Sequence, residues 1–375
     1  SEPMDTANYT TWLEIDLGAV RNNIRQTNKI TGRPVMAVVK GNAYGHGVEA
    51  VSRAALEAGA TWLAVARFEE AQALREMGFT APVLVLGYTP PGRAAEAAAR
   101  DIALAVSDPE TASAYSGAAD GGSGKPLRLH LKLDTGMGRL GVMAGEAVPF
   151  IQHARSLPGV EVEGIFTHFA CADQPARDVT PGQLRRFQEV VASLQASGWR
   201  PPLLHTSNSA ASLYFPEAWF DLVRLGIALY GLDPSHDAPT PREFQKALSW
   251  KTRLVSVKTL PAGHGVSYGH RYHTSADERI GVIAVGYADG LRRKLDVNHC
   301  LVRGTRVPVV GTVCMDQCMV QLDGVPDARV GDEVVLIGRQ GSGRITAEDV
   351  ADAWGTINYE VTCGTAARVP RIYIG

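Results

Sequence analysis

The stretch LRLHLKLDTGMGRLG, residues 127–141, combines an alternating pattern with a glycine-rich turn. Leucines alternate with the polar residues Arg128, His130, Lys132 and Asp134, which predicts a β-strand with one apolar face. If the apolar face packs against helices, the polar face points into the interior of a barrel. A lysine is costly there unless it is paired, for example with Asp134, or chemically modified. The stretch therefore favours a barrel strand in which Lys132 has a specific partner or modification.

The glycines of this stretch, Gly136, Gly138 and Gly141, reproduce the G-x-G-x-x-G spacing of a dinucleotide-binding loop. Such a loop leads straight into a helix and is followed about 20 residues later by an acidic residue, and Glu161 and Glu163 lie near that distance. However, the loop follows the fifth predicted strand, whereas a dinucleotide loop follows the first. We expect a sharp turn at the end of a barrel strand, with a nicotinamide enzyme as the alternative.

Seven further β-rich runs surround this strand and alternate with helical patterns. They lie at residues 34–40, 62–66, 82–87, 102–106, 160–168, 202–206 and 221–226. Helices are expected between them, for example over residues 68–77 and 108–117. Eight strands with intervening helices predict an α/β fold, an N-terminal (β/α)8 TIM-type barrel over residues 1–243. A doubly wound open sheet is the alternative.

The sequence pattern changes after about Ser249, where short alternating runs are broken by Gly, Pro and Asp. This pattern predicts a C-terminal, mostly-β domain over residues 244–375, to which the first residues of the chain could also belong. The turn-rich segment SHDAPTPR, residues 235–242, is the expected linker, which places the boundary between Asp233 and Gln245.

Composition narrows the function classes. The 375 residues contain 37 Lys and Arg against 39 Asp and Glu, so a nucleic-acid partner is not expected. The five cysteines form no C-x-x-C pair, and Cys314 and Cys318 lack a nearby histidine, so no metal site is expected. No apolar run approaches the roughly 20 residues of a membrane span, and the N-terminal segment does not resemble a signal peptide. We expect a small-molecule substrate and a cytoplasmic location, without a membrane partner.

Lys40 is the first candidate for chemistry, because it ends the first predicted strand and a glycine-rich turn follows at once, in AVVKGNAYGHG. In a barrel this position lies at the carboxyl ends of the strands, where such folds carry their active sites. A desolvated lysine can form an imine with a carbonyl cofactor. The alternative is a solvated lysine at a strand end.

A phosphate-binding site is predicted near the last two strands. His168 and His205 each end a strand, and Ser207 follows His205. The amides around Ser207 and those of Gly226 and Ile227 could bind a phosphate, which many barrel enzymes hold after their last strands. Arg224 precedes this site by two residues. A histidine at a strand end is otherwise a structural residue.

Together, these stretches resemble the bacterial alanine racemase family, whose members are two-domain barrel enzymes that use pyridoxal phosphate. The resemblance spans residues 40–373 in family order and rests on AVVKGNAYGHG, LKLDTGMGRLG, THFACAD, HTSNSAA, VRLGIALYG, GVSYGH, GYADG, GTVCMDQCMV and INYEV with RVPRIY. It implies a homodimer with shared active sites and interconversion of L-alanine and D-alanine, which supplies D-alanine for peptidoglycan.

The resemblance also assigns roles to residues. It implies that Lys40 holds pyridoxal 5'-phosphate as an aldimine and is one catalytic base, and that Tyr268 of a second subunit is the other. Tyrosine is a weak base at neutral pH and needs a group that assists it. The resemblance implies a hydrogen-bond chain that runs from Tyr268 through His168 to Arg224, and it implies that Arg224 faces the pyridine nitrogen. The implied phosphate contacts are Tyr44, Ser207, Gly226, Ile227 and Tyr359. The implied carboxylate contacts are Arg139 and Met315 of the second subunit, with Lys132 carbamylated behind Arg139.

Three alternatives share parts of this pattern. A serine or broad-specificity racemase would use the same scaffold. A barrel-type pyridoxal phosphate decarboxylase is expected to place an acidic residue at the ring nitrogen, where this sequence offers Arg224. A single-barrel pyridoxal phosphate carrier lacks the domain that bears Tyr268 and Met315.

Overall fold

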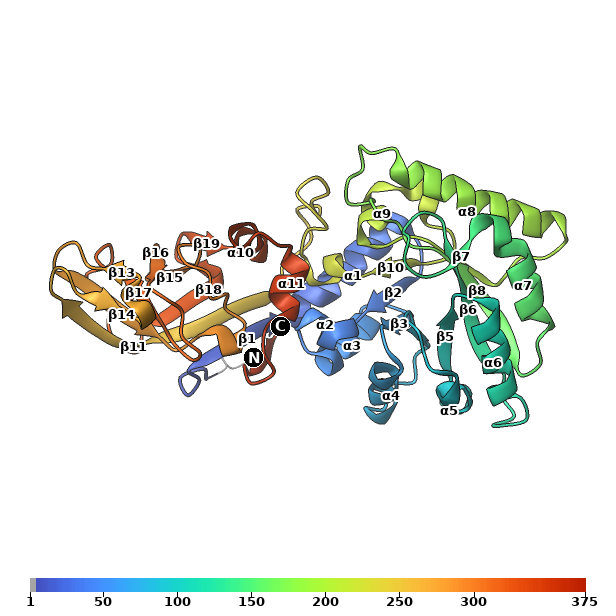
Figure 1. The fold of residues 1–375 in the computed structure, drawn as a ribbon, viewed down its shortest axis with the longest axis horizontal. Helices are drawn as coiled ribbons and strands as arrows, with labels where there is room; N and C mark the ends of the chain where they lie inside the picture. Colours follow the sequence, from blue (N-terminus) through green and yellow to red (C-terminus); the bar gives the residue numbers. More distant parts are fainter. Residues whose placement is uncertain (1–4) are drawn as a thin grey trace. The chain divides into compact units, whose positions relative to one another are not determined.

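The structure is a computed structural model that describes residues 5–375 and consists of two compact units (Figure 1). The barrel unit contains Val20–Ala43 and Val48–Gln245. The β-rich unit contains the described residues up to Ala19, the short segment Tyr44–Gly47, and Lys246–Gly375. The N-terminal residues therefore belong with the C-terminal half of the chain.

Eight parallel strands form the main sheet of the barrel unit, in the order β10-β2-β3-β4-β5-β6-β8-β9. Their bounds are β2 Val35–Val38, β3 Trp62–Val65, β4 Val83–Val85, β5 Ile102–Val106, β6 Leu127–Asp134, β8 Val160–Phe166, β9 Leu203–His205 and β10 Val223–Leu225. The two end strands also meet, because the Arg224 amide donates to the Ser207 carbonyl at 3.0 Å. The sheet is thus a nearly closed barrel, and the predicted (β/α)8 architecture is confirmed.

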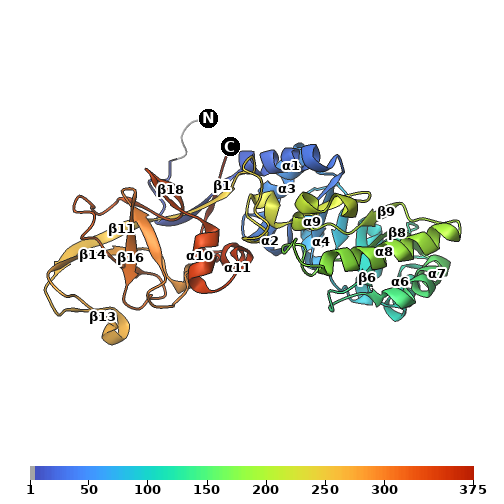
Figure 2. The same cartoon turned by 90° about the horizontal axis from the view of Figure 1, so that it is seen from above.

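Helices lie around this sheet (Figures 1 and 2). They are α1 Leu17–Thr31, α3 Val48–Glu57, α4 Phe68–Glu76, α5 Ala94–Ala99, α6 Pro109–Ala119, α7 Ala147–Ser156, α8 Val179–Ala196 and α9 Ser209–Tyr214, with short 3-10 turns at Pro91–Arg93, Ala144–Glu146, Pro216–Ala218 and Ile227–Tyr230. Helix α6 begins where its sequence predicts, because the Asp108 carboxylate accepts a hydrogen bond from the Thr111 amide at 2.7 Å. Helix α4 buries Phe68, Ala71 and Leu74 at every third position.

Strand β6 has the two faces that its alternation predicts. Its four leucines are fully buried, as expected for a face covered by helices. On the other face, His130 and Lys132 are also buried, and the His130 ring lies 5.2 Å from the His205 ring of β9, measured between centroids. The polar face of β6 therefore lines the inside of the barrel.

The glycine-rich segment after β6 is a turn. Gly141 has φ of 128°, and a Cβ atom there would lie 2.5 Å from the Asp134 amide nitrogen, so only glycine fits. The chain then enters the short strand β7 (Val142–Met143), which pairs with β6, before helix α7 begins. Because the loop does not lead straight into a helix, the dinucleotide-binding alternative is wrong.

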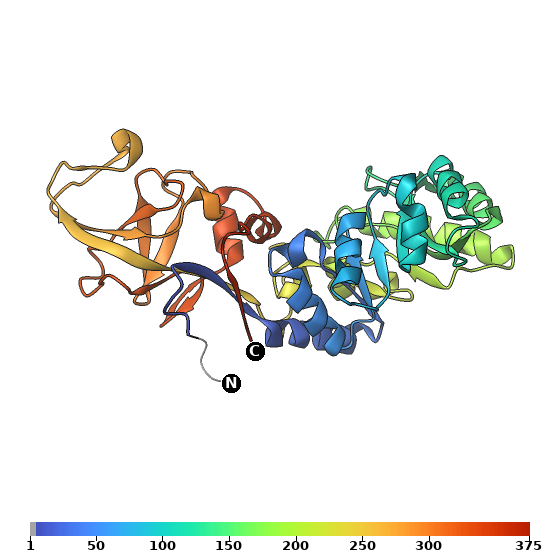
Figure 3. The same ribbon diagram turned by 90° about the horizontal axis from the view of Figure 1, so that it is seen from below.

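The β-rich unit is built on a second sheet of nine strands. They are β1 Thr11–Asp16, β11 Leu248–Leu260, β14 Glu278–Ile283, β15 His299–Val302, β16 Thr305–Val310, β17 Cys318–Gln321, β18 Glu333–Gln340, β19 Gly343–Ile345 and β20 Arg371–Ile374. Strand β11 pairs with both β14 and β18, which closes six of these strands into a ring. The N-terminal strand β1 pairs antiparallel with β11, and the two run together in Figure 3.

Smaller elements complete the β-rich unit. They are the hairpin of β12 (Gly265–Val266) and β13 (Tyr272–His273), the helices α10 Ala347–Trp354 and α11 Asn358–Cys363, and the 3-10 turns Tyr268–His270 and Tyr287–Asp289. Trp12 and Trp250 are among the largest fully buried side chains of the unit. The C-terminal domain is thus mostly strand, as predicted. Across residues 5–375, the structure contains no helix with the length and apolar character that a membrane crossing requires.

Candidate active site

Lys40 stands at the start of a left-handed turn, α2 (Lys40–Tyr44), directly after strand β2. Gly41, Asn42 and Ala43 all have left-handed helical dihedrals, with φ between 53° and 61°, and Tyr44 has φ of 53°. This conformation costs roughly 1–2 kcal/mol for each residue that is not glycine. Strained backbone of this kind persists only where the surrounding structure enforces it, and it is concentrated at functional sites.

Hydrogen bonds from neighbouring segments hold the turn in place. The Glu70 carboxylate accepts from the Gly41 amide at 2.8 Å with one oxygen, and from the amides of Ala66 and Arg67 at 3.0 Å with the other. The Asn42 side chain accepts from the Val48 amide at 2.8 Å. Glu70 thereby ties the lysine turn to the neighbouring βα connection after β3. No motif in the sequence marks Glu70 as a site residue.

Four cations converge around His168, which follows strand β8. Burial lowers the pKa of His168 well below its ordinary value, and the charges of Arg224, Lys132, Arg139 and Lys40 lower it further. His168 is therefore neutral near pH 7. The barrel unit thus brings together five predicted site residues at the carboxyl ends of its strands.

Lys132 is the most constrained of these cations, because only 4% of its surface is exposed. Burial and the nearby charges of Arg139 and Arg224 lower its pKa to about 8, against a smaller opposing effect of Asp134. The Asp134 carboxylate accepts hydrogen bonds from the amides of Gly136 and Gly138, so it shapes the glycine turn that carries Arg139. The amine of Lys132 lies 5.6 Å from the centroid of the Phe166 ring.

Arg224 is buried and hydrogen-bonded to neutral acceptors. Its guanidinium donates to His205 Nδ1 at 2.8 Å, to His168 Nδ1 at 3.2 Å and to the Thr167 carbonyl at 2.9 Å. Burial lowers its pKa to about 9, so it remains a cation at neutral pH. The predicted link between His168 and Arg224 is present in the structure.

The predicted phosphate-binding segment contains two serines with different surroundings. The Ser207 hydroxyl is fully buried and donates to the Ala218 carbonyl at 2.7 Å, so it is committed to the fold. The Ser209 hydroxyl accepts from the amides of Gly226 and Ala228 at 3.0 and 3.2 Å. With both lone pairs used, it can act only as a donor toward a further group. Ser209, which was not among the predicted site residues, is therefore the serine that contacts the Gly226 amide.

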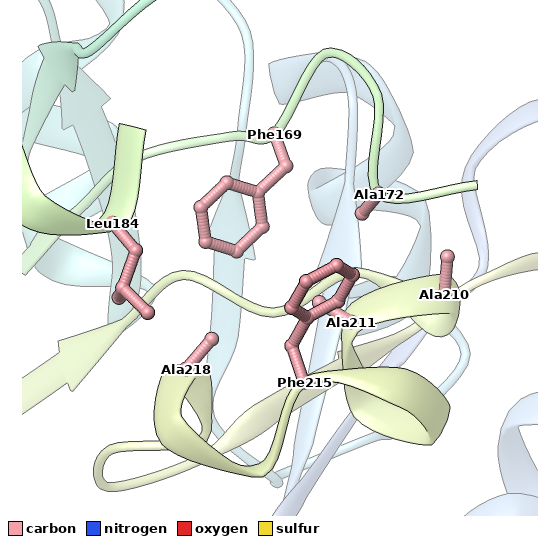
Figure 4. Packing of buried hydrophobic residues seen from close by; sticks show 7 residues of the cluster. All are labelled: Phe169, Ala172, Leu184, Ala210, Ala211, Phe215 and Ala218. Atoms are coloured by element: carbon pink, nitrogen blue, oxygen red, sulfur yellow. The ribbon is translucent and has the colours of Figure 1, made fainter. Parts of the chain in front are cut away.

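An apolar cluster supports the loops that carry His168 and Ser209 (Figure 4). Phe169 and Phe215 face each other in this cluster, with Leu184 of helix α8 at its side. Ala210 and Ala211 belong to the same cluster and directly follow Ser209. Because these side chains are buried against one another, they hold the backbone that carries the polar groups.

Two predicted phosphate contacts, Tyr44 and Tyr359, lie together in the β-rich unit. Their ring centroids are 6.1 Å apart. Burial raises the pKa of Tyr44, and Tyr359 and Cys363 add to this effect. The Tyr44 hydroxyl is therefore protonated near pH 7.

Two other predicted residues, Tyr268 and Met315, stand on linked loops of the β-rich unit. Their side chains are 71% and 52% exposed. Ser267, which precedes Tyr268, has φ of 66°, and its hydroxyl donates to the Thr312 carbonyl. The Thr312 hydroxyl in turn donates to the Tyr268 carbonyl at 2.9 Å. Both large side chains are thus held by fixed backbone while they face outward from their own unit.

The part of the chain that the structure describes contains no group of three or more His, Cys, Asp or Glu side chains suited to a metal ion. The barrel unit offers instead a strained lysine turn, four cations and hydroxyl donors at the carboxyl ends of its strands. These features are typical of a two-domain barrel enzyme, with a lysine and a face suited to an anionic ligand at the carboxyl ends of its strands.

Comparison with known families gives the particular family. The profile described as "Alanine racemase, N-terminal domain" matches residues 15–234, and "Alanine racemase, C-terminal domain" matches residues 247–373. A curated alanine racemase of Symbiobacterium thermophilum is 48% identical over 368 residues, which cover 97% of each chain. This chain belongs to the alanine racemase family of enzymes.

Solved structures agree with this assignment. A crystal structure of alanine racemase from Bacillus anthracis with bound L-Ala-P superposes with a TM-score of 0.92 at 42% identity, and covers 100% of this chain and 96% of that one. A histidine racemase from Leuconostoc mesenteroides is also similar, with a TM-score of 0.89 and 33% identity over 98% of this chain and 99% of that one. The same architecture therefore serves racemases with different substrates.

Proposed function

We propose that this chain is a pyridoxal phosphate-dependent racemase that interconverts L-alanine and D-alanine. The observation that carries the proposal is the convergence of Lys40, Lys132, Arg139 and Arg224 around His168. Two of these cations, Lys132 and Arg224, are buried, and a buried cation is costly unless an anion compensates it. Pyridoxal phosphate and an amino acid supply a phosphate and a carboxylate, which match this need.

The residues present fit the cofactor. Lys40 would hold it covalently. The Ser209 hydroxyl and the Ile227 amide would bind the phosphate, with Gly226 shaping that segment. Tyr44, whose hydroxyl is protonated near pH 7, would donate a further hydrogen bond to the phosphate. We retain Tyr359 as a further phosphate contact, since its ring lies beside Tyr44.

Arg224 would face the pyridine nitrogen. Its protonated guanidinium can only donate hydrogen bonds, so the nitrogen opposite it must accept one and carry no proton. The acceptors that surround Arg224 are neutral imidazoles and backbone carbonyls. This environment favours a racemase over the decarboxylase alternative, for which an acidic residue is expected at the same place.

Two groups on opposite faces of the substrate would move the proton. When bound, pyridoxal phosphate withdraws electrons from the amino acid attached to it and makes the α proton removable. Inversion of a stereocentre requires an acid–base group on each face. We assign these roles to Lys40, which takes the proton from D-alanine, and to Tyr268 of a second copy of the chain, which takes it from L-alanine. The outward exposure of Tyr268 supports a role in a homodimer.

Arg139 and Lys132 would bind the substrate carboxylate, together with the Met315 amide of the second copy. A pKa of about 8 leaves part of the Lys132 amine neutral near pH 7, and a neutral amine can add carbon dioxide to give a carbamate and one released proton. This change would replace a cation by an anion among Arg139, Arg224 and Lys40. It would also hold Arg139 in place for the substrate. The D-alanine formed would be a precursor of peptidoglycan.

A second candidate function is racemisation of a different amino acid, because a histidine racemase shares this architecture. Purified protein with pyridoxal phosphate should therefore be incubated with L-alanine, L-serine and L-histidine in parallel, and the D isomers measured by chiral chromatography. We expect the highest kcat/KM with L-alanine. Faster turnover of another amino acid would change the substrate, and no racemisation in cofactor-loaded protein would refute the proposal.

The role of Lys40 has its own test. Lys40→Ala should lower kcat by roughly a thousandfold or more, because the variant loses an acid–base group and the covalent link to the cofactor. Borohydride reduction followed by peptide mapping should find the cofactor on Lys40 in the unchanged protein. Lys125→Ala, at an exposed lysine of the same unit, is the matched control and should leave both readouts unchanged.

A further inference from the structure

A continuous line of hydrogen bonds runs through the barrel interior behind Arg224. Glu163 Oε1 lies 2.9 Å from His130 Nε2, His130 Nδ1 lies 2.9 Å from His205 Nε2, and His205 Nδ1 lies 2.8 Å from the Arg224 guanidinium. The four residues come from strands β8, β6, β9 and β10. Both histidines are fully buried, and Arg224 is 3% exposed. The reaction proposed above uses Arg224 and leaves the other three residues without a role.

The direction of every bond in this line is fixed by its ends. A guanidinium donates only, so His205 Nδ1 must accept, and the proton of a neutral His205 is then on Nε2. His205 Nε2 donates to His130 Nδ1, which places the His130 proton on Nε2, facing the Glu163 carboxylate. One tautomer of each histidine satisfies all three bonds.

The charges of these groups agree with this direction. Burial lowers the pKa of both histidines, most strongly for His205, so both are neutral near pH 7. Burial alone would raise the pKa of Glu163, but the hydrogen bonds from His130 and Arg128 outweigh it and lower the pKa. Glu163 is therefore an ionised acceptor, and its charge lies two imidazoles away from Arg224.

The fold makes space for this arrangement. The pairing of β6 with β8 shifts by one residue, from Leu129 opposite Val162 to His130 opposite Gly164, so Glu163 occupies a β-bulge. A Cβ atom at position 164 would lie 2.5 Å from His130 Nδ1, and only glycine leaves room for the ring. The His205 ring is stacked on Phe166 with centroids 4.8 Å apart. Both rings are thus confined.

We propose that Glu163 and His130 are positioning residues that hold His205 in the tautomer that accepts from Arg224, and so fix the guanidinium. A carboxylate in direct contact with Arg224 would fix it too, but would place a negative charge beside the cofactor ring. The line of imidazoles orients Arg224 while keeping that charge distant. The effect on the reaction rests on the proposed function, whereas the tautomers do not.

The first test reads the tautomers directly, by histidine 15N NMR of the full-length protein. We expect protons on Nε2 of both His130 and His205. In Glu163→Leu, His130 loses its acceptor, and we expect its proton to move to Nδ1. His130 Nδ1 would then donate to His205 Nε2, and the single proton of His205 would move to Nδ1, where it opposes the Arg224 guanidinium. Glu163→Gln keeps an acceptor oxygen and should restore the original tautomers.

The second test measures the reaction in cofactor-loaded protein. Glu163→Leu should lower kcat about tenfold, with KM changed less than twofold, because a hydrogen bond to a charged group is lost from the line that holds Arg224. The ratio of racemisation to transamination should fall as well, and Glu163→Gln should recover most of both. Glu161→Gln, at an exposed carboxylate on the same strand, is the matched control.

The outcomes separate the two proposals. A protein with the expected tautomers but no racemisation would refute the proposed function and leave the tautomer assignment in place. A racemase in which His205 carries its proton on Nδ1, or in which Glu163→Leu changes neither tautomers nor kcat, would overturn the inference. If Glu163→Leu does not fold, Gly164→Ala displaces the His130 ring with the carboxylate intact, and unchanged tautomers and kcat there would refute it equally.

Discussion

At the amino ends of the barrel strands, Arg128 pairs with both Glu163 and Asp101 at 3.0 Å, whereas at the carboxyl ends Lys132, Arg139 and Arg224 lie together around the neutral His168. Arg75, at the same amino-end side of the barrel, donates to four backbone carbonyls at 2.8 Å. The cations at the amino ends are thus satisfied within the fold. At the carboxyl ends, by contrast, the charges of Arg139 and Arg224 add to burial in lowering the pKa of Lys132, so this end suits an anionic ligand.

The largest expected effect concerns the free-energy cost of burying Lys132 at the carboxyl ends of the strands. In cofactor-free protein without carbon dioxide, Lys132→Met should raise the free energy of unfolding at pH 7 by up to about 3 kcal/mol, because the folded-state pKa of Lys132 is about 8 against an ordinary 10.5. Below pH 8 the lysine is protonated in both states and the full cost is present. The cost falls as pH rises from 8 towards 10.5, so the difference in stability between the two proteins should shrink steadily between pH 8 and pH 10. Urea unfolding at pH 7 to 10 measures this.

The control for this experiment is Lys125→Met, which should change stability little at any pH, because Lys125 is exposed. Addition of bicarbonate should stabilise the unchanged protein more than Lys132→Met, since only the former can form the carbamate. Equal stability of the two proteins at pH 7 would mean that the fold already compensates this lysine.

A smaller effect is expected when one arginine is replaced at each end of the barrel strands, Arg139 at the carboxyl ends and Arg75 at the amino ends. Arg139→Met should raise KM for alanine by roughly 10- to 100-fold, the value of a charge-assisted hydrogen bond. Arg75→Met should instead lower the thermal midpoint and leave KM within about twofold, because its partners are carbonyls of the fold. Steady-state kinetics and thermal unfolding of both variants measure the change in KM and the change in thermal midpoint. An unchanged KM in Arg139→Met would remove Arg139 from the substrate site.

The smallest expected effect concerns two serines of one segment. Ser209→Ala should weaken pyridoxal phosphate binding to the cofactor-free protein about fivefold to tenfold, because it removes one donor to the phosphate. Ser207→Ala should leave binding nearly unchanged and cost about 1 kcal/mol of stability, because its hydroxyl bonds the Ala218 carbonyl. Spectrophotometric titration of both variants measures this. Weaker binding in Ser207→Ala alone would restore the original prediction.

Much of the fold follows from local patterns. The eight barrel strands, the helices over residues 68–77 and 108–117, and the mostly-β C-terminal domain were all predicted from periodicity, because alternation and three-to-four-residue spacing reflect which face is buried. The glycine turn after β6 was also predicted, since a positive φ at Gly141 requires glycine. The pairing of β1 with β11 was only an option in the sequence, because strands far apart in the chain carry no signal of their partner.

The candidate site divides in a similar way. Lys40, His168 and Arg224 could be proposed from their places at or near strand ends, whereas Arg139 was implied by the family resemblance. The structure brings the three cations together around His168. The choice between Ser207 and Ser209 could not be made from HTSNSAA, because both serines lie near the strand end. It depends on which hydroxyl turns inward to Ala218 and which one meets the Gly226 amide.

The sequence by itself determined the barrel, the second domain and the lysine at the end of the first strand, because these depend on residue type and spacing along the chain. The tertiary structure decided how the charged groups are compensated. The β-bulge at Glu163, the space above Gly164 and the line from His130 to Arg224 all depend on contacts between strands that are distant in sequence. Hydrogen-bond direction and charge balance are set by such neighbours, and these exist only in the folded barrel.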